Sequence, residues 1–176
     1  MKKILTLGAS TSKNSINKQL AYWAANQIEN VQIQLLDLNE FDLPLYSVDN
    51  EKRLGEQKAC QKFLDKIRTS DGIIISMAEH NGSYTAAFKN ILDWTTRIEK
   101  NLWHGKPMLI LATSPGARGA YTVLKSAALS FPHFGANVIE TFSLPSFYEN
   151  FKDDKILDEG LKRDLLSKIE KFKDSI

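Results

Sequence analysis

Near the middle of the chain lies Gly72-Ile73-Ile74-Ile75-Ser76-Met77, a run that is almost entirely apolar and rich in β-branched residues. Such a run is typical of a central strand buried on both faces of a parallel sheet. Further apolar runs occur at residues 4–7, 31–38, 107–113 and 138–142. Segments with helical periodicity separate these runs, so the sequence predicts an α/β fold: a doubly wound sheet of five parallel strands with helices on both faces.

Five helices are expected between and after these strands. Apolar residues recur at spacings of three and four in residues 16–28, 63–67, 87–98 and 157–172, and a further helix is expected over 121–129. The longest irregular stretch, about residues 39–51, is expected to be a loop. Loops of that length are often functional, and this one is expected where a lid could form.

Length and composition restrict the class of protein. The 176 residues are expected to form a single domain, 1–176, with a core large enough to fold without disulfides or metals. Hydrophobic residues make up 43% and charged residues 25%, which excludes disordered, collagenous and disulfide-scaffold classes. The net charge of +2 requires no polyanionic partner, so we expect no nucleic-acid role.

Cysteine, histidine and the N-terminal residues indicate no metal site and no membrane anchor. Cys60 is the single cysteine and is expected on a helix surface or half-buried. His104 and His133 stand apart from any metal-ligand spacing. Met1-Lys2-Lys3 leads into an apolar run too short for a signal peptide or a membrane span, so we expect a cytoplasmic protein with no membrane partner.

The loop after the first strand has the composition of a phosphate site. In a doubly wound sheet, ligands bind beyond the carboxyl ends of the strands. Residues 8–17 are small and hydroxyl-rich, and they enter a helix whose free N–H groups and positive dipole end favour an anion. The loop lacks both GxxxxGKS/T and GxGxxG, so a monophosphate fits better than ATP. The alternative is an ordinary capped helix start, because Ser, Thr and Asn favour such positions.

Two further loops at the same edge are rich in turn-forming residues. They are residues 78–84, after the third strand, and residues 113–119, after the fourth. Glycines let a backbone approach a flat ligand closely, and Asn, Ser and main-chain N–H groups can satisfy ring carbonyls and nitrogens. Three such loops at one sheet edge predict a ligand site more strongly than any one of them.

The sequence from Glu79 to Trp94 resembles the motif PEYNGSxPxxLKNAIDW of the NAD(P)H-dependent FMN reductase family of flavodoxin-like proteins. Residues 9–17 resemble the family's GSxRxxSxN loop, and residues 113–119 resemble its TSPGxxGG-like loop. The resemblance runs in register from the first strand to at least Gly119. It implies a flavodoxin-like sheet with strand order 2-1-3-4-5.

The resemblance also implies an FMN site built from the three loops. The implied cofactor-binding residues are Ser10, Ser12, Ser15, Ile16, Asn17, Ala78, Glu79, His80, Asn81, Gly82, Ser114, Pro115, Gly116 and Gly119. Those in residues 10–17 would surround the phosphate, and the others would lie along the ribityl chain and the isoalloxazine ring. Ser12 stands where many members have a phosphate-binding Arg, which leaves hydroxyls, backbone N–H groups and Lys13 to hold the dianion. His80 replaces the usual Tyr and keeps a flat ring at the site.

The activity implied by the resemblance is that of an oxidoreductase. It would take hydride from NADPH or NADH onto FMN and pass electrons to a quinone, an azo compound, free flavin or a similar small acceptor in a ping-pong cycle. The flavin supplies the chemistry, so no catalytic acid or base is named. A flavodoxin-type electron carrier without nicotinamide turnover is the alternative, although the charge balance offers no acidic docking face. A serine hydrolase is disfavoured because no G-x-S-x-G motif occurs.

A homodimer or homotetramer is expected, because the family assembles in this way and closed two-fold dimers are common. One side of the helix 87–98 is expected to pack on the sheet: Ala87, Ile91, Trp94 and Ile98. The other side, with Phe88, Leu92 and Thr95, is expected to meet a partner subunit.

Overall fold

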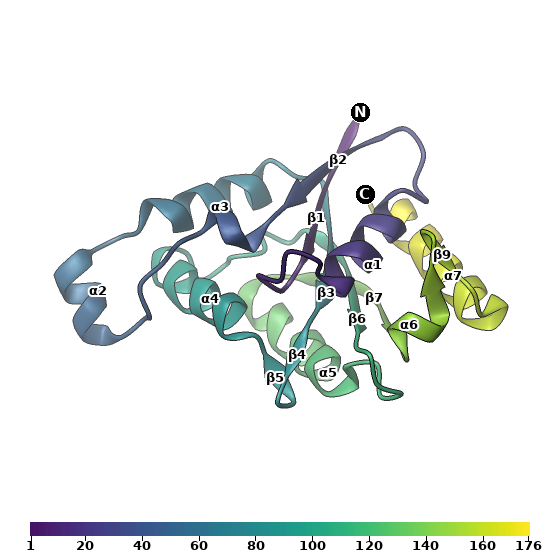
Figure 1. The fold of residues 1–176 in the computed structure, drawn as a ribbon. Helices are drawn as coiled ribbons and strands as arrows, with labels where there is room; N and C mark the ends of the chain where they lie inside the picture. Colours follow the sequence, from purple (N-terminus) through teal and green to yellow (C-terminus); the bar gives the residue numbers. More distant parts are fainter.

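A five-stranded parallel sheet forms the centre of the computed structural model, which describes all 176 residues (Figure 1). Its strands are β1 (Lys2–Gly8), β2 (Val31–Leu36), β3 (Gly72–Met77), β6 (Pro107–Thr113) and β7 (Asn137–Leu144). They lie in the order β2-β1-β3-β6-β7, and every neighbouring pair is parallel. Counted along the chain this is the order 2-1-3-4-5, so the expected fold is confirmed.

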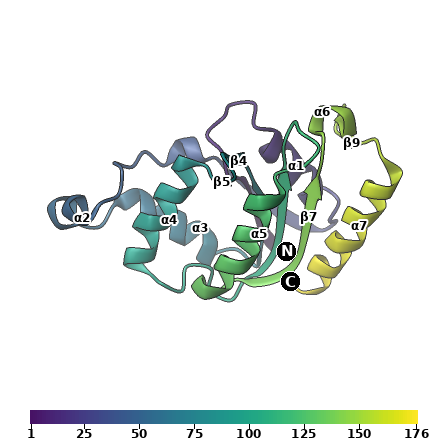
Figure 2. The same cartoon turned by 90° about the horizontal axis from the view of Figure 1, so that it is seen from below.

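Helices cover both faces of the sheet (Figure 2). α1 (Ile16–Ala25) and α7 (Glu159–Asp174) pack on one face, and α3 (Lys58–Arg68), α4 (Ala86–Ile98) and α5 (Tyr121–Ser130) pack on the other. In β3, Ile73 and Ile75 point into the core beneath α3, α4 and α5, whereas Ile74 points into the core beneath α1 and α7. Burial on both faces explains why this strand is apolar without alternation.

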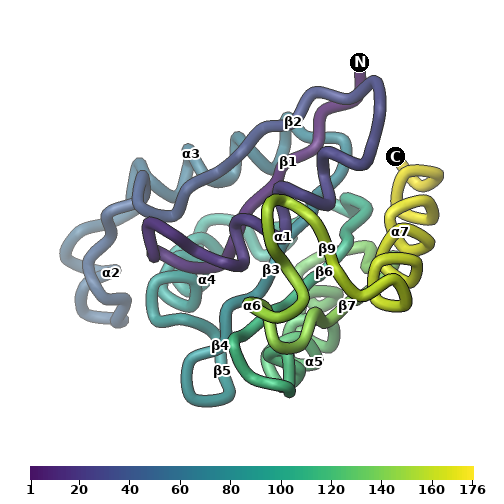
Figure 3. The backbone as a smooth tube through the Cα atoms, turned by 45° about the vertical axis from the view of Figure 1, so that its right-hand side comes forward, coloured from purple at the N-terminus to yellow at the C-terminus, as the bar shows by residue number.

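Several short elements were not expected from the sequence. They are η1 (Leu38–Glu40), α2 (Val48–Leu54), β4 (Glu79–His80), β5 (Ser83–Tyr84), η2 (Phe131–Phe134), α6 (Phe147–Asn150), β8 (Phe151–Lys152) and β9 (Lys155–Ile156). The strands pair into two hairpins, β4–β5 and β8–β9, and two-residue strands are too short to show an alternating pattern. Figure 3 shows α6 and the β8–β9 hairpin beside the start of α1.

The prediction of an uninterrupted loop over residues 39–51 was wrong, because η1 and α2 lie partly within it. The Ser47 hydroxyl caps α2 by accepting the Asn50 N–H at 3.0 Å, and Gly55, at φ +65°, ends the helix. α2 buries none of its residues and protrudes from the body of the molecule (Figures 1 and 2). Without a buried face it has no apolar stripe, so periodicity could not reveal it.

The segment before α2 is held on α4. Trp94 Nε1 donates to the Pro44 carbonyl at 2.7 Å, and the Tyr46 N–H donates to Asn90 Oδ1 at 2.8 Å. The Tyr46 ring also packs edge-on against the Trp94 ring, with the ring centres 5.3 Å apart. Trp94 is therefore a packing residue, and residues 43–46 form a fixed wall on α4.

The expectation that the second side of α4 meets a partner subunit was wrong. Phe88, Leu92 and Thr95 are only 0%, 6% and 0% exposed within the single chain. The centre of the Phe131 ring of η2 lies 6.2 Å from the centre of the Phe88 ring, and Cys60 of α3 lies against Thr95. Cys60 is itself fully buried, not at a helix surface or half-buried, and burial raises the pKa of its thiol. α3 and η2 together cover the side of α4 that does not face the sheet.

The C-terminal helix packs against the start of β3. Asp158 caps α7 by accepting the Leu161 N–H at 2.8 Å, so Leu157, expected on its apolar side, lies outside the helix and is exposed. A Cβ at Gly72 would lie 2.6 Å from Ile176 Cγ2 and 2.8 Å from Phe172 Cζ, so a larger residue there would have to displace these side chains. None of the helices combines the length and the apolar character that crossing a membrane would require.

Candidate functional site

A pocket of about 200 Å³ lies at the carboxyl ends of β1, β3 and β6. Its lining residues are Ser10, Ser12, Asn14, Ser15, Ile16, Asn17, Ala78, Glu79, His80, Thr113, Ser114, Pro115 and Tyr148. The structure thus brings the three loops together, as the sequence predicted. Four of the predicted site residues do not line this pocket: Asn81, Gly82, Gly116 and Gly119.

The start of α1 forms one wall of the pocket. Ser15 caps the helix by accepting the Lys18 N–H at 3.2 Å, which leaves its own hydroxyl proton free to donate. The N–H groups of Ile16 and Asn17 are the first of the helix and have no preceding turn to bind. A Cβ at Gly8 would lie 2.4 Å from the Lys18 nitrogen, so this glycine lets β1 and α1 meet closely. The wall therefore presents donors and the positive end of the helix dipole.

Asn17 holds the edge of the pocket together through its buried side chain. Its Oδ1 accepts the Ser76 hydroxyl at 2.7 Å and the Thr113 N–H at 3.1 Å, and its Nδ2 donates to the Thr113 carbonyl at 3.1 Å. These three bonds use both lone pairs of Oδ1 and one of the two Nδ2 hydrogens, so Asn17 positions the loops with its side chain. Its backbone N–H and the second Nδ2 hydrogen remain without a partner.

Serine hydroxyls complete the first loop. Ser10 Oγ accepts the Ser12 N–H at 3.1 Å, and Ser12 and Lys13 are exposed. Lys18 is engaged elsewhere, because its Nζ binds Asp37 Oδ2 at 2.9 Å. This hydrogen bond is the main cause that lowers the pKa of Asp37.

The second loop is a tight hairpin. Asn81 and Gly82 have φ of +51° and +75°, as a two-residue type I′ turn between β4 and β5 requires. Both are exposed at the tip of the hairpin, beyond the pocket lining. At its other end the Thr85 hydroxyl donates to the Ala9 carbonyl at 2.9 Å, which ties the hairpin to the first loop.

Glu79 is the single acidic residue in the lining, and its carboxylate makes a structural hydrogen bond. Its Oε2 accepts the Val123 N–H at 2.9 Å, at the first turn of α5. The N-cap residue of α5, Ala120, has no side chain able to cap the helix. Glu79 supplies that cap from another element, so its Oε2 faces the N-terminal end of α5.

The third loop is fixed by the start of α6. The Phe147 N–H donates to the Ser114 carbonyl and the Ser146 N–H donates to the Gly116 carbonyl, both at 3.0 Å. Gly116 lies in open space, whereas a Cβ at Gly119 would lie 2.3 Å from Ser143 Oγ. Gly119 thus packs against the end of β7, and Ser114 and Pro115 supply the lining.

Sequence reasoning did not single out three lining residues: Asn14, Thr113 and Tyr148. Asn14 and Thr113 belong to loops that were recognised, but Tyr148 lies on α6, beyond the fifth strand. Its side chain is 71% exposed, and its ring packs edge-on against the Phe147 ring with the ring centres 5.6 Å apart. The position of α6 at the same carboxyl edge was the available signal, because strand β7 also ends there.

The sequence matches the family model described as NADPH-dependent FMN reductase over residues 2–149. The chain belongs to this family. Among the relatives of this chain, 2-hydroxy-1,4-benzoquinone reductase of Burkholderia sp is 35% identical over 119 residues, which cover 66% of this chain and 63% of that protein. NADPH azoreductase of Bacillus sp. (strain OY1-2) is 27% identical over 137 residues, which cover 78% of this chain and 72% of that protein.

A solved structure shares the fold over nearly the whole length of both chains. It is FerB, a flavoenzyme NAD(P)H:(acceptor) oxidoreductase from Paracoccus denitrificans, with a TM-score of 0.78 and 27% sequence identity. The alignment covers 99% of this chain and 96% of that one. The strand order and the helices on both faces are therefore those of a solved flavoenzyme.

The donor set of the pocket fits the phosphate of FMN, the cofactor that the family description implies. Three serine hydroxyls and the first N–H groups of α1 meet at one wall, and the one carboxylate of the lining binds the Val123 N–H. This wall of donors suits a dianion even though no Arg lines the pocket.

Proposed function

We propose that residues 1–176 form one FMN-binding domain of a cytoplasmic NAD(P)H-dependent oxidoreductase. It passes electrons from NADPH or NADH through FMN to a quinone, an azo compound, free flavin or a similar small acceptor in a ping-pong cycle. The observation that supports this proposal is the pocket itself, which joins the anion-binding start of α1 to the loops after β3 and β6. That arrangement suits a ligand with a phosphate at one end and a flat ring at the other.

The residues of this chain divide into binding and positioning roles. Ser10, Ser12 and Ser15 hold the phosphate together with the N–H groups at the start of α1. The backbone at Ala78–His80 and Ser114–Pro115 borders the rest of the cofactor, and Asn17 and Thr85 fix the loops through buried hydrogen bonds. When bound, FMN supplies the hydride and electron chemistry, so no side chain is assigned as acid or base.

The visible spectrum and anaerobic reduction test this function. The purified protein is mixed with FMN, and the bound flavin is titrated with NADPH and with NADH in the absence of oxygen. We expect the flavin absorbance to bleach within seconds and to return when benzoquinone is added. A flavin that binds but stays oxidised would favour the electron carrier without nicotinamide turnover. Failure to bind FMN would refute both functions.

A homodimer or homotetramer remains part of the proposal. The apolar side chains of Leu45, Val48 and Leu54 are exposed on and beside the protruding α2. They support this proposal, because burying exposed apolar surface against a second subunit is energetically favourable. Light scattering should report about two or four times the chain mass of 19.9 kDa. A monomer at micromolar concentration with full turnover would contradict this part alone.

A further inference from the structure

Neither lysine nor arginine lines the candidate cofactor pocket. Lys18 Nζ is bound to Asp37 Oδ2 at 2.9 Å, and Arg118 Nη2 donates to the Thr122 hydroxyl at 2.7 Å. Lys152 lines a neighbouring cavity but not this pocket. At the wall formed by the start of α1, an anion therefore depends on hydroxyls and N–H groups, and each further donor there adds to its binding.

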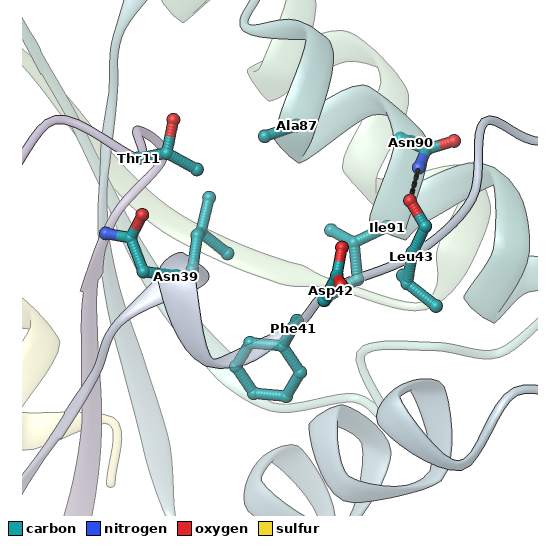
Figure 4. Close-up of a pocket in the computed structure, with 9 residues that line it drawn as sticks. Thr11, Asn39, Phe41, Asp42, Leu43, Ala87, Asn90 and Ile91 are labelled. Carbon is teal, nitrogen blue, oxygen red and sulfur yellow. Dashed lines mark hydrogen bonds between the residues drawn. The ribbon is translucent and has the colours of Figure 1, made fainter.

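The first loop, which follows β1, presents its hydroxyls to two different cavities. Ser10, Ser12 and Ser15 line the cofactor pocket, whereas Thr11 lines a larger cavity of about 470 Å³ (Figure 4). Figure 4 shows Thr11 on the same cavity as the Asp42 side chain. The Thr11 side of the loop therefore adds no donor to the cofactor pocket. A further side-chain donor for a phosphate has to come from another element.

Tyr148 of α6 is placed to supply this donor. It lines the cofactor pocket together with the serines of the first loop. It also lines a cavity of about 350 Å³ together with Asn14 and Ile16, and this cavity includes no residue of the loops after β3 and β6. Figure 3 shows α6 beside the start of α1. Tyr148 therefore lies at the phosphate end of the pocket.

The Tyr148 hydroxyl has no hydrogen-bond partner within the chain. The hydroxyls of Tyr46 and Tyr84, in contrast, are bound to Glu51 at 2.8 Å and to Ser130 at 2.7 Å. The Tyr148 side chain is 71% exposed, so packing does not explain its place at the rim of the pocket. A phenolic O–H can donate to an oxyanion, and such charge-assisted hydrogen bonds are stronger than neutral ones.

The backbone that carries Tyr148 is fixed before any ligand arrives. The Phe147 N–H donates to the Ser114 carbonyl at 3.0 Å, which ties α6 to a loop that lines the same pocket. The Phe147 ring is 3% exposed and stacks on the Phe151 ring, with the ring centres 4.9 Å apart. Because Phe147 anchors α6 in the core, Tyr148 is presented at a defined place, and its hydroxyl can bind without the entropy loss of ordering a loop.

We propose that Tyr148 is a phosphate-binding residue. Its hydroxyl donates to the phosphate of FMN, which compensates in part for the absent Arg and favours FMN over riboflavin, the same flavin without a phosphate. The inference rests on the proposed function, because it requires FMN in this pocket. It gives α6 a role in cofactor selection that lies outside the three loops of the family motif.

The test compares FMN with riboflavin, because the ratio of their Kd values reports the contribution of the phosphate alone. Fluorescence titration of the flavin-free protein measures both. Tyr148→Phe removes only the hydroxyl, so FMN binding should weaken about tenfold, the low end of the range for a hydrogen bond to a charged group, and riboflavin binding should change less than twofold. Tyr22→Phe is the matched control, because it removes a half-exposed phenol of α1 outside the lining, and it should leave both Kd values unchanged.

Circular dichroism confirms that each variant is folded. A folded Tyr148→Phe variant with the wild-type ratio of Kd values would overturn the proposal, whether its affinity for both flavins is unchanged or equally reduced. An equal loss would indicate that Tyr148 only shapes the pocket.

Inorganic phosphate gives a second readout that does not need the flavin ring. The Tm of the flavin-free protein is measured in phosphate and in chloride at equal ionic strength. An anion that binds the folded state raises the Tm, so phosphate should raise the Tm of the wild type and of Tyr22→Phe. In Tyr148→Phe the rise should be less than half as large. The same rise in all three proteins, or none in the wild type, would contradict the proposal.

The failure of this inference and the failure of the proposed function are distinguishable. A wild type that binds FMN and is bleached by NADPH, with a Tyr148→Phe variant of the same FMN affinity, refutes the role of Tyr148 and leaves the oxidoreductase function standing. A wild type that never binds FMN refutes the function, and a phosphate effect on Tm that is lost in Tyr148→Phe then leaves Tyr148 in an anion site. A protein that responds to neither FMN nor phosphate refutes both.

Discussion

The Ser76 hydroxyl donates to Asn17 Oδ1 at 2.7 Å, which joins the start of α1 to the end of β3. The same amide bonds the backbone of Thr113 at the end of β6, so one side chain connects three elements beneath the candidate cofactor pocket. Asn17 is 3% exposed and Ser76 and Thr113 are fully or almost fully buried. Loss of this amide would leave several buried polar groups without partners.

Asn17→Ala should therefore lower the free energy of unfolding by about 2–3 kcal/mol, the scale of buried groups that lose their hydrogen-bond partners. Urea denaturation followed by circular dichroism measures the loss. Asn14→Ala removes an exposed amide from the same loop and should change stability by less than about 0.5 kcal/mol. A difference of less than about 0.5 kcal/mol between the two variants would show that the amide is not a structural tie.

Ser15→Asp separates cofactor binding from helix capping. Aspartate is as good an N-cap as serine, so α1 should keep its start. Its charge would face the phosphate, and FMN binding should weaken by at least about 2 kcal/mol, or about thirtyfold, in a fluorescence titration. Ser47→Asp, the same exchange at the N-cap of α2, lies away from the pocket and serves as the control. Unchanged FMN affinity in Ser15→Asp would remove the first loop from the site.

The five-stranded sheet was predictable because its strands and helices carry visible patterns in the sequence, whereas the strand order followed from the family resemblance. Gly72–Met77 is apolar throughout since both faces of β3 are buried, and the stripe of α4 follows from its packing on the sheet. The loops of the candidate site were found from their composition and from the family motif. These signals are local, and each lies within one continuous segment of the chain.

The features that sequence reasoning missed depend on contacts between distant residues. Glu79 caps α5 although it lies 44 positions away from Val123 in the chain, and no sequence pattern in either segment indicates this hydrogen bond. The side of α4 at Phe88 and Leu92 was misassigned because burial by α3 and burial by a partner subunit give the same apolar pattern. α2 was missed because it buries no residue and so carries no pattern.

Asp37→Asn tests the ion pair between Asp37 and Lys18 through its pH dependence. The pKa of Asp37 is lowered in the folded protein, mainly by the hydrogen bond from Lys18, so its contribution to stability is present above its unfolded pKa of about 3.9 and is lost as pH falls through the folded value. At pH 7 the variant should be less stable by about 1 kcal/mol, because both side chains are about a quarter to a third exposed. Urea denaturation at pH 7 and near pH 3 should show the difference shrinking at the lower pH. A difference that stays constant or grows on acidification would contradict this account.

Gly119→Ala and Gly82→Ala distinguish backbone strain from crowding in the segments that follow β6 and β3. Both glycines have positive φ, +56° and +75°, so alanine costs about 1 kcal/mol of backbone strain at either position. At Gly82 the new Cβ would meet only Thr122 Cγ2 at 4.0 Å, and no further loss of stability is expected. At Gly119 it would lie 2.3 Å from Ser143 Oγ and 3.0 Å from the Pro145 nitrogen, so the loss should reach about 2–4 kcal/mol by urea denaturation. Adding Ser143→Ala should restore only part of it, because the Pro145 backbone remains in contact. Equal losses in the two single variants would mean that the loop after β6 can move away from the end of β7, and that Gly119 is needed there for its backbone conformation alone.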